Sequence, residues 1–295
     1  MRKILVLGVQ GQLGRALREV LKGTLTVFAS RAEVDLVDPC AVERFLQAER
    51  PNVLINAAAY TAVDQAESDR EAAHLVNALS PGVMAEWCVR NQAQFVHFST
   101  DYVFSGDGIT PWRESDPTSP LNVYGQTKAQ GEVLIEHAGG QYLIFRTSWV
   151  YDLSGKNFLR TIIRLAKERE SLQVVDDQIG APTYAMDLAQ GAWDALCLAQ
   201  GRNSFPSGIY HLCNQGETSW YGFAQAIFSE LADSGVVLQV KQVNPVVSSL
   251  YPTLAKRPKN SRLSQAKVFQ TFGLTLPHWK VSLQNAIRSG IQEFK

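Results

Sequence analysis

The sequence lacks the features of a membrane protein or a nucleic-acid-binding protein. Its 28 basic and 28 acidic side chains give a formal net charge of zero, so no overall field attracts it to nucleic acid or to an anionic membrane. No apolar run approaches the ~20 residues that span a bilayer. The apolar stretch after Arg2 is too short for a signal peptide, because Gln10 and Gln12 interrupt it. We therefore expect no nucleic-acid partner and no membrane partner.

Cysteine is scarce and dispersed. The four cysteines, Cys40, Cys88, Cys197 and Cys213, form no close pair in the sequence, and the five histidines show no metal-ligand spacing. This pattern argues against a disulfide framework and against a zinc site. We expect no bound metal and a cytoplasmic location, where thiols stay reduced.

Short apolar runs alternate with helical patterns through the first half of the chain. The expected strands cover residues 3–8, 25–29, 52–58, 95–100 and 142–149, and the expected helices cover residues 12–22, 39–49, 70–91 and 124–137. Continuous apolar strands separated by helices are typical of a parallel sheet covered on both faces. The sequence therefore predicts an α/β fold with a Rossmann-like doubly wound parallel sheet.

The second half is less regular, with expected helices at 157–168 and 184–198 and expected strands at 172–175 and 209–213. We expect a dinucleotide-binding domain over residues 1–149, to which about residues 172–200 return. Residues 150–171 and 201–295 are expected to form a smaller, mixed α/β substrate-binding domain. Residues 106–121 contain three prolines and follow a strand, which predicts an irregular loop where ligands bind in open α/β sheets.

A glycine-rich segment, Gly8 to Gly14, separates the first strand from the first helix. Gly8, Gly11 and Gly14, with Gln12 and Leu13 between them, permit a tight turn and close approach of the backbone to a pyrophosphate. Glycine-rich turns also serve ordinary connections between a strand and a helix. The position of this one favours dinucleotide binding.

The ends of the next two strands supply further candidate cofactor contacts. Ser30 and Arg31 follow the second strand without an acidic neighbour, which suits a 2′-phosphate, although Arg31 could equally be a solvated surface residue. Asp35 and Leu36 could cover the adenine, or Asp35 could serve only as a turn or helix cap. The small side chains of 57–59 (Ala57, Ala58 and Ala59) permit close approach of a ligand, as would packing against a helix.

Three residues carry the candidate chemistry. Thr100 ends a predicted strand, and Tyr124 and Lys128 lie four residues apart, on the same face of a predicted helix. An ammonium beside a phenol is expected to lower the pKa of the tyrosine, making it a usable proton donor near neutral pH. Taken alone, the pair could be two surface residues of an amphipathic helix. Together with Thr100 and the glycine-rich loop, it indicates carbonyl reduction.

Over nearly its whole length, the chain resembles the extended short-chain dehydrogenase/reductase family. The segments that carry the resemblance lie at 11–14, 35–38, 56–64, 99–104, 122–128, 146–151 and 257–261. Within the family it is most similar to enzymes that reduce the C4 carbonyl of a dTDP-linked 4-dehydro-deoxysugar. The resemblance therefore implies a dTDP-sugar as the substrate, and Ser30 and Arg31 favour NADPH as the cofactor, with NADH also accepted.

The same resemblance assigns roles to individual residues. It implies that Tyr124 is the catalytic acid, that Lys128 orients the nicotinamide ribose and that Thr100 hydrogen-bonds the substrate carbonyl. Asp101, Tyr102 and Trp149 are implied to lie along the sugar nucleotide; these three complete the candidate site. Some family members carry an acidic residue after the last glycine of the first loop, where it contributes to a magnesium-bridged dimer. This chain has Arg15 there, so the expectation is a monomer or a homodimer without that bridge.

Three other functions remain open from the sequence. Sugar-nucleotide dehydratases of this family place an Asp-Glu pair after the threonine, whereas here Asp101 is followed by Tyr102. An epimerase would retain NAD, against which Arg31 argues mildly. A regulatory subunit that binds a dinucleotide without catalysis resembles the same enzymes, and the presence of Thr100, Tyr124 and Lys128 favours an enzyme over that role.

Overall fold

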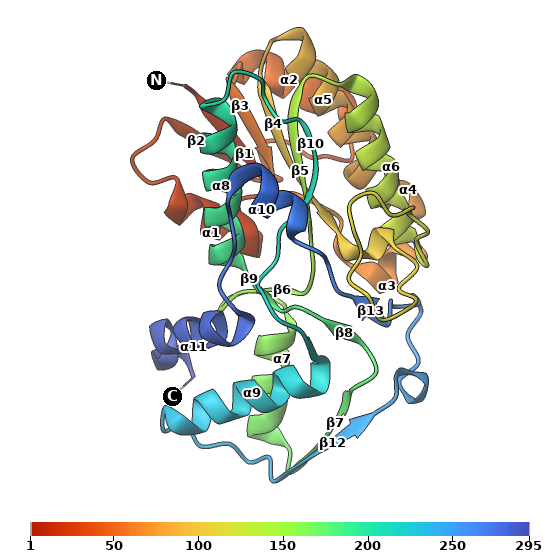
Figure 1. Cartoon of the computed structure of the whole chain (residues 1–295), viewed down its shortest axis with the longest axis vertical. Coiled ribbons are helices and arrows are strands. Elements are labelled where there is room, and N and C mark those ends of the chain that lie inside the picture. Colours follow the sequence, from red (N-terminus) through yellow and green to blue (C-terminus); the bar gives the residue numbers. More distant parts are fainter. Residues whose placement is uncertain (1, 295) are drawn as a thin grey trace.

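A six-stranded parallel sheet forms the centre of the larger of two lobes in the computed structural model, which describes residues 2–294. Figure 1 shows this lobe above and the smaller lobe below. In spatial order the strands are β10 (Gly208–His211), β5 (Gln141–Thr147), β4 (Gln94–Thr100), β3 (Val53–Asn56), β1 (Ile4–Leu7) and β2 (Thr26–Ala29). Every neighbouring pair is parallel. The predicted Rossmann-like sheet is confirmed.

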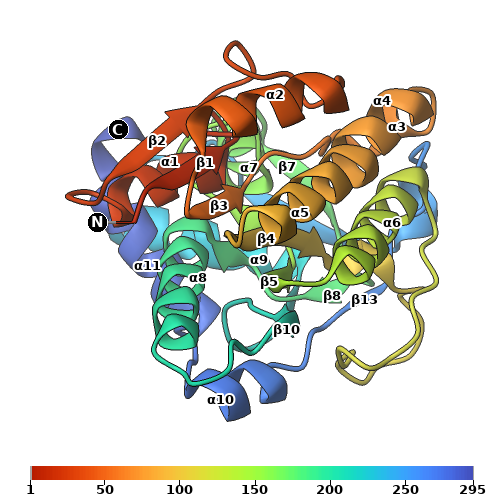
Figure 2. The ribbon, with the colours of Figure 1, turned by 90° about the horizontal axis from the view of Figure 1, so that it is seen from above.

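Helices cover both faces of this sheet, as Figure 2 shows from above. They are α1 (Gln12–Val20) and α8 (Ala185–Gln200) on one face, and α2 (Pro39–Glu49), α5 (Ser80–Arg90) and α6 (Val123–Ala138) on the other. Successive strand residues point to opposite faces, so Val6 and Ile55 pack toward α1 and α8, while Leu5 and Leu54 pack toward the other three helices. Burial on both faces explains why the strands are continuous apolar runs.

The strand order reverses at β1, which lies between β2 and β3. The chain leaves β1 for β2 in one direction and then returns to β3 on the other side. In doubly wound sheets such a reversal opens a crevice at the carboxyl ends of the strands, and ligands bind there. Gly8 follows β1 and Ala57 follows β3, so both lie at this crevice.

The predicted helix at 70–91 is built from three consecutive segments. α4 (Arg70–His74) leads into a π-helical turn at Leu75–Leu79, which continues into α5. Asn77 in this turn accepts a hydrogen bond from the Tyr60 backbone N–H at 2.9 Å and donates to the Tyr60 carbonyl at 3.1 Å. The wider turn therefore fixes the segment that follows β3 next to the crevice.

The smaller lobe has its own hydrophobic core, formed mainly by α7 (Phe158–Glu168), α9 (Trp220–Asp233) and α11 (Trp279–Ser289). Its strands are β6 (Val150–Tyr151) with β9 (Thr183–Tyr184), β7 (Ser171–Val175) with β12 (Gln242–Val246), and β8 (Ile179–Gly180) between β11 (Thr218–Ser219) and β13 (Asn260–Ser261). The smaller lobe is therefore the expected mixed α/β unit. The remaining α-helices among the described residues, α3 (Val63–Ala66) and α10 (Ala266–Phe272), lie on the larger lobe, where α3 packs against α6 and α10 packs against α8 and β10.

Two strands lie on the other side of the predicted boundaries between the lobes. β7 pairs with β12 and not with the main sheet, whereas β10 pairs with β5 at the edge of that sheet. Ile209 and Tyr210 of β10 are buried in the cores on its two faces, which explains why this strand joins the larger lobe. The returning segment is therefore α8 and β10. None of the helices between residues 2 and 294 has the length and apolarity to cross a membrane.

Candidate active site

A cavity of about 490 Å³ opens at the carboxyl ends of β1 to β4. Its wall brings together most of the predicted cofactor residues: Gly8, Gly11, Gln12, Leu13, Ser30, Arg31, Asp35, Leu36, Ala57, Ala58, Ala59, Tyr124 and Lys128. Gly14 is the one predicted cofactor residue outside this lining. Thr100, Asp101, Tyr102 and Trp149 also lie outside it, beyond the Tyr124 end.

Glycine is required at two positions of the first loop. Gly8 has φ +83°, and a Cβ there would lie 2.5 Å from the backbone nitrogen of Ala58. A Cβ on Gly14 would lie 2.2 Å from the Gly8 carbonyl oxygen. Gly14 therefore acts by letting α1 pack against the loop. The helix begins after Gly11 without a side-chain cap, which leaves its first N–H groups available for an anion.

The adenosine end of the cavity differs from the prediction. The Glu33 carboxylate accepts hydrogen bonds from the N–H and the hydroxyl of Ser30, and Arg31 forms an ion pair with Asp35 at 2.9 Å. The expectation of no acidic group beside Ser30 was wrong, because a turn folds Glu33 back onto it. A 2′-phosphate at Ser30 would have to displace this carboxylate.

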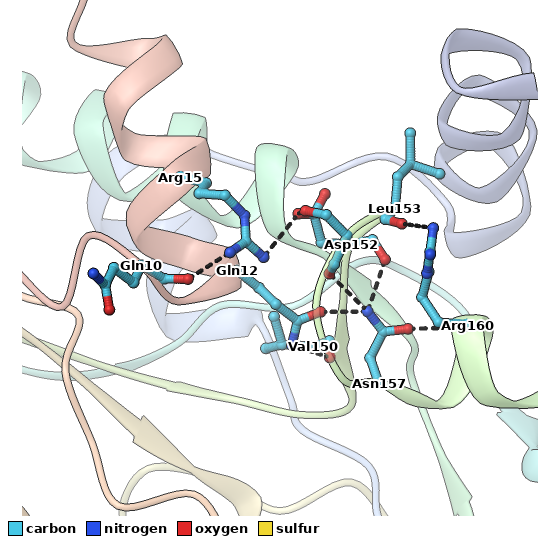
Figure 3. Close-up of polar contacts among 9 residues, drawn as sticks. Gln10, Gln12, Arg15, Val150, Asp152, Leu153, Asn157 and Arg160 are labelled. Atoms are coloured by element: carbon cyan, nitrogen blue, oxygen red, sulfur yellow. Dashed lines mark hydrogen bonds and ion pairs between the residues drawn. The ribbon is translucent and has the colours of Figure 1, made fainter. Parts of the chain in front are cut away.

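A polar bridge connects the first loop to the smaller lobe across the cavity (Figure 3). Asn157 donates to Gln12 Oε1 at 2.7 Å, and Arg15 lies 3.6 Å from the Asp152 carboxylate. Arg15 also donates to the Gln10 carbonyl. The two contacts with the smaller lobe, at Asn157 and Asp152, were not predictable from the sequence because their partners are more than a hundred residues apart. The bridge brings Val150, Gly155 and Lys156, which also line the cavity, over the start of α1.

Lys128 lies at the inner end of the cavity and is only 1% exposed. Its Nζ lies 3.0 Å from Nε2 of His97 and donates to the Phe98 carbonyl at 2.5 Å. Burial lowers the pKa of Lys128 to about 8, and the nearby Glu132 carboxylate partly opposes this shift.

Tyr124 differs from the prediction in its acidity. Burial raises the pKa of Tyr124 to about 12; a hydrogen bond with Thr100 lowers the pKa and the charge of Asp101 raises it. The expectation that Lys128 lowers the pKa of this phenol was wrong for this structure, because the amine is held by His97 and Phe98. Tyr124 therefore keeps its proton at neutral pH.

Thr100, Asp101 and Tyr102 gather around Tyr124. The Thr100 hydroxyl donates to Asp101 Oδ1 at 3.2 Å, and the ring of Tyr102 meets that of Tyr124 edge-on with centroids 5.5 Å apart. Burial raises the pKa of Asp101 to about 7, although hydrogen bonds from Ser261 and Thr100 lower it. The structure thus brings the hydroxyl, the phenol and a carboxyl group together.

Trp149 lies at the junction of the two lobes. Its backbone adopts φ 49°, a left-handed conformation that is rare for a bulky residue. Its indole stacks on Trp220 with ring centroids 3.6 Å apart. A Cβ on Gly180 would lie 2.8 Å from the indole and 3.0 Å from Ser261. Because Ser261 is also close enough to Asp101 to lower the pKa of that carboxyl group, Trp149 lies on the Asp101 side of the site.

Two residues that the sequence analysis did not assign have buried hydroxyls in the cavity. Ser99 Oγ and Thr147 Oγ1 have no hydrogen-bond partner among the described residues, and both residues line the cavity. Buried hydroxyls normally find a partner, so these two fit polar groups of a bound molecule. Ser99 is the last residue but one of β4 and Thr147 is the last residue of β5, and this position near a strand end was the available signal.

The residues present fit a dinucleotide. The glycine loop permits close approach of a pyrophosphate, the first turn of α1 offers free N–H groups, and the far end supplies unpartnered hydroxyls and an amine. The doubly wound sheet, this cavity and the Tyr124–Lys128 pair define the class of extended short-chain dehydrogenases/reductases.

The comparison with known proteins identifies the family within that class. The model of the RmlD substrate binding domain matches residues 1–291, and the chain belongs to this family. A curated relative from Burkholderia thailandensis, a dTDP-4-dehydrorhamnose reductase, is 45% identical over 97% of this chain and 98% of its own length.

Solved structures agree with this assignment. A dTDP-4-dehydrorhamnose reductase from Clostridium acetobutylicum superposes with a TM-score of 0.89 at 37% identity, over 98% of this chain and 99% of its own. A dTDP-4-dehydrorhamnose reductase from Bacillus anthracis, solved in complex with NADP, gives 0.88 at 35% identity with the same coverage. The predicted resemblance is confirmed.

Proposed function

We propose that the protein reduces the C4 carbonyl of dTDP-4-dehydro-L-rhamnose to give dTDP-L-rhamnose, the last step in the synthesis of this sugar nucleotide. The observation that carries the proposal is that Tyr124 and Lys128 line the dinucleotide cavity together, with Thr100 close enough to Tyr124 to lower its pKa. The near-full-length similarity to reductases of this name supports the choice of substrate.

The side chains of the site supply the proton and orient the substrate carbonyl and the cofactor. The dinucleotide, when bound, supplies the hydride. Tyr124 donates its proton to the carbonyl oxygen, and Thr100 holds that oxygen through its hydroxyl. Lys128, deeper in the cavity, orients the nicotinamide ribose. Because the pKa of Tyr124 is raised, the phenol enters the reaction in its protonated form.

The cavity wall would hold NADPH in an extended form. Gly8 and Gly11 would hold the pyrophosphate with the adjacent residues Gln12 and Leu13, while Gly14 shapes the loop. Residues 30–36 and the alanines at 57–59 would enclose the adenosine. The Bacillus anthracis relative binds NADP, and we propose NADPH as the preferred cofactor. NADH is also accepted in this proposal, since the Glu33 carboxylate competes with a 2′-phosphate for Ser30.

The sugar nucleotide is proposed to bind between the two lobes. Asp101, Tyr102 and Trp149 would line its site, which extends from Tyr124 toward the smaller lobe. In this proposal the larger lobe, mainly residues 1–149, is the dinucleotide-binding domain, and the smaller lobe is the substrate-binding domain. The bridge between Gln12 and Asn157 supports a cofactor site that both lobes complete.

Three further proposals concern the location of the protein, its oligomeric state and its partners. We propose a cytoplasmic enzyme that acts as a monomer or a homodimer, without a nucleic-acid or membrane partner. The zero net charge and the free thiols of all four cysteines support this setting. Arg15, paired with Asp152, is unsuited to binding magnesium.

The test follows the loss of NADPH absorbance with dTDP-4-dehydrorhamnose supplied. Steady oxidation that depends on the sugar nucleotide is the expected result. Tight NADPH binding without turnover would instead support the regulatory-subunit alternative. A requirement for tightly retained NAD would support an epimerase.

A further inference from the structure

A buried row of polar groups runs from the end of β3 to the amine of Lys128. Asn56, His97 and Lys128 are each 1% exposed. Asn56 Oδ1 accepts from the Ala58 N–H at 3.1 Å, and Asn56 Nδ2 lies 3.2 Å from His97 Nδ1. His97 Nε2 lies 3.0 Å from Lys128 Nζ, which donates to the Phe98 carbonyl at 2.5 Å. The reaction as proposed above uses neither Asn56 nor His97.

The protons in this row can be placed in one direction only. The Ala58 N–H can only donate, so it fixes Oδ1 of Asn56 and turns Nδ2 toward His97. Asn56 therefore donates to Nδ1, which carries no proton. Burial keeps the pKa of His97 well below its ordinary value, so the ring is neutral and its proton is on Nε2. An ammonium has no lone pair to accept from Nε2–H, whereas an uncharged amine has one.

We propose that His97 is a positioning residue that holds the Lys128 amine uncharged in the free protein, and that this amine gains a proton when the dinucleotide binds. This inference rests on the proposed function, since it requires Lys128 to face the nicotinamide ribose. Ribose oxygens would accept hydrogen bonds from an ammonium, and the cofactor phosphates would bring negative charge into the cavity. Both effects favour the charged lysine.

The charged groups around Lys128 are consistent with this state. Glu132, one turn along α6, is the carboxylate that raises the pKa of Lys128, but Arg146 of β5 donates to it twice, at 2.9 and 2.6 Å. Tyr124, one turn earlier, is a neutral phenol at neutral pH, and Asp101 at the end of β4 has a raised pKa. Burial of the amine therefore dominates, and the hydrogen bond from the imidazole favours the uncharged form further.

The test is a pH titration of the protein with lysine labelled with ¹³C at Cε, followed by NMR. The Lys128 signal is assigned by its loss in Lys128→Met. In the free protein its midpoint should lie below neutral pH, so that the amine is uncharged there, against about 10.4 for an ordinary lysine. NADPH should raise the midpoint by about one to two pH units, a ten- to hundredfold change in proton affinity. A midpoint above neutral pH in the free protein would mean that the amine is charged there and would overturn the proposal.

Two variants test the role of His97 itself. Asn56→Asp reverses the row, because a carboxylate accepts from both Ala58 N–H and Nδ1–H and leaves Nε2 to accept from an ammonium. His97→Gln can turn its amide oxygen toward the amine. Each should raise the free-protein midpoint by about one pH unit or more. His137→Gln, on the same helix as Lys128, is the matched control and should leave it unchanged.

Unchanged midpoints in both folded variants would overturn the assignment to His97. The free-protein titration uses neither cofactor nor sugar, so its outcome is separate from that of the proposed reaction. A protein that fails to reduce the sugar can still show the low midpoint. A reductase with an ordinary midpoint would retain the proposed function and lose this inference.

Discussion

The Glu33 carboxylate accepts hydrogen bonds from the backbone N–H and the hydroxyl of Ser30, at 2.6 and 2.5 Å. It thereby occupies the groups to which a 2′-phosphate would bind at the end of β2. The pKa of Glu33 is lowered, mainly by the hydroxyl hydrogen bond, so the group is charged at neutral pH. In the function proposed above, cofactor choice therefore depends on the competition between this carboxylate and the 2′-phosphate.

We expect Glu33→Gln to favour NADPH. The substitution removes the negative charge and keeps the size of the side chain, so NADPH should bind about two- to fivefold more tightly, a range set by exposed charge pairs. NADH, which has no 2′-phosphate, should change little. Kd values for both cofactors from nicotinamide fluorescence, at low and high salt, would measure this.

Arg31→Ala is the opposing variant. The Arg31 guanidinium is exposed and pairs with Asp35 in this structure, but it can turn toward a bound 2′-phosphate. Its loss should therefore weaken the binding of NADPH selectively. Glu19→Gln, which removes a charge on the exposed side of α1, serves as the control for Glu33→Gln. Equal changes for NADPH and NADH in the Glu33 variant would show that the 2′-phosphate lies elsewhere.

Tyr124→Phe should lower turnover about 10²–10⁴-fold, the span for loss of a general acid. The substitution keeps the ring that packs edge-on against Tyr102 and removes only the proton donor. NADPH affinity should remain close to that of the parent protein, since Lys128 is intact. Stopped-flow measurement of a single turnover would separate the chemical step from product release. Near-parental turnover would exclude Tyr124 as the acid.

Asp101 should make the protein less stable as the pH rises. Burial raises its folded-state pKa to about 7 from 3.8, so the folded state binds the proton more tightly than the unfolded state. This contribution is fully present below about pH 4 and is lost as the pH rises through 7. The loss amounts to at most about 4 kcal/mol in the free energy of unfolding.

Asp101→Asn removes this titration. Its effect on the free energy of unfolding should therefore be more stabilising at pH 8 than at pH 5, as measured by urea unfolding at both pH values. Asp107→Asn, at an exposed position six residues further on, is the control. If the difference between Asp101→Asn and the parent protein is the same at both pH values, the carboxyl group titrates normally.

The parts of the fold that were predictable from the sequence are those fixed by local signals. The helix at 39–49 has the predicted bounds because Asp38 caps its N-terminus and Pro39 occupies the first turn. The smaller lobe was predicted only in outline, because several of its strands have two residues and pair across large sequence separations. Such short strands have no periodicity to recognise.

The candidate site likewise contains residues that local sequence signals predict and residues that they do not. Most of the predicted residues that line the cavity lie at strand ends, in the glycine loop or on the α6 face with Tyr124 and Lys128, positions that sequence patterns mark. His97 was not singled out, because in the sequence it is only one residue of an apolar strand. Its significance comes from Asn56 and Lys128, on either side of it in the fold. Glu33 was missed because its contact with Ser30 depends on how one turn closes.

Trp149→Ala tests whether the indole lines the sugar site. If it does, the KM for the sugar nucleotide should rise about 10- to 100-fold, the loss expected for a buried aromatic contact, with NADPH affinity unchanged. The difficulty is that the same substitution also removes the stack on Trp220 and leaves alanine at φ 49°. A rise in KM could then reflect a disturbed junction between the lobes.

Comparison with Trp149→Gly separates the two causes. Both variants lose the indole, but glycine adopts a left-handed conformation without strain, so Trp149→Gly should be the more stable by about 1 kcal/mol. If the indole contacts the sugar nucleotide, the two variants should show the same raised KM despite their different Tm values. If the residue is structural, KM should recover in the glycine variant along with stability. Equal KM values close to that of the parent protein would place Trp149 outside the substrate site.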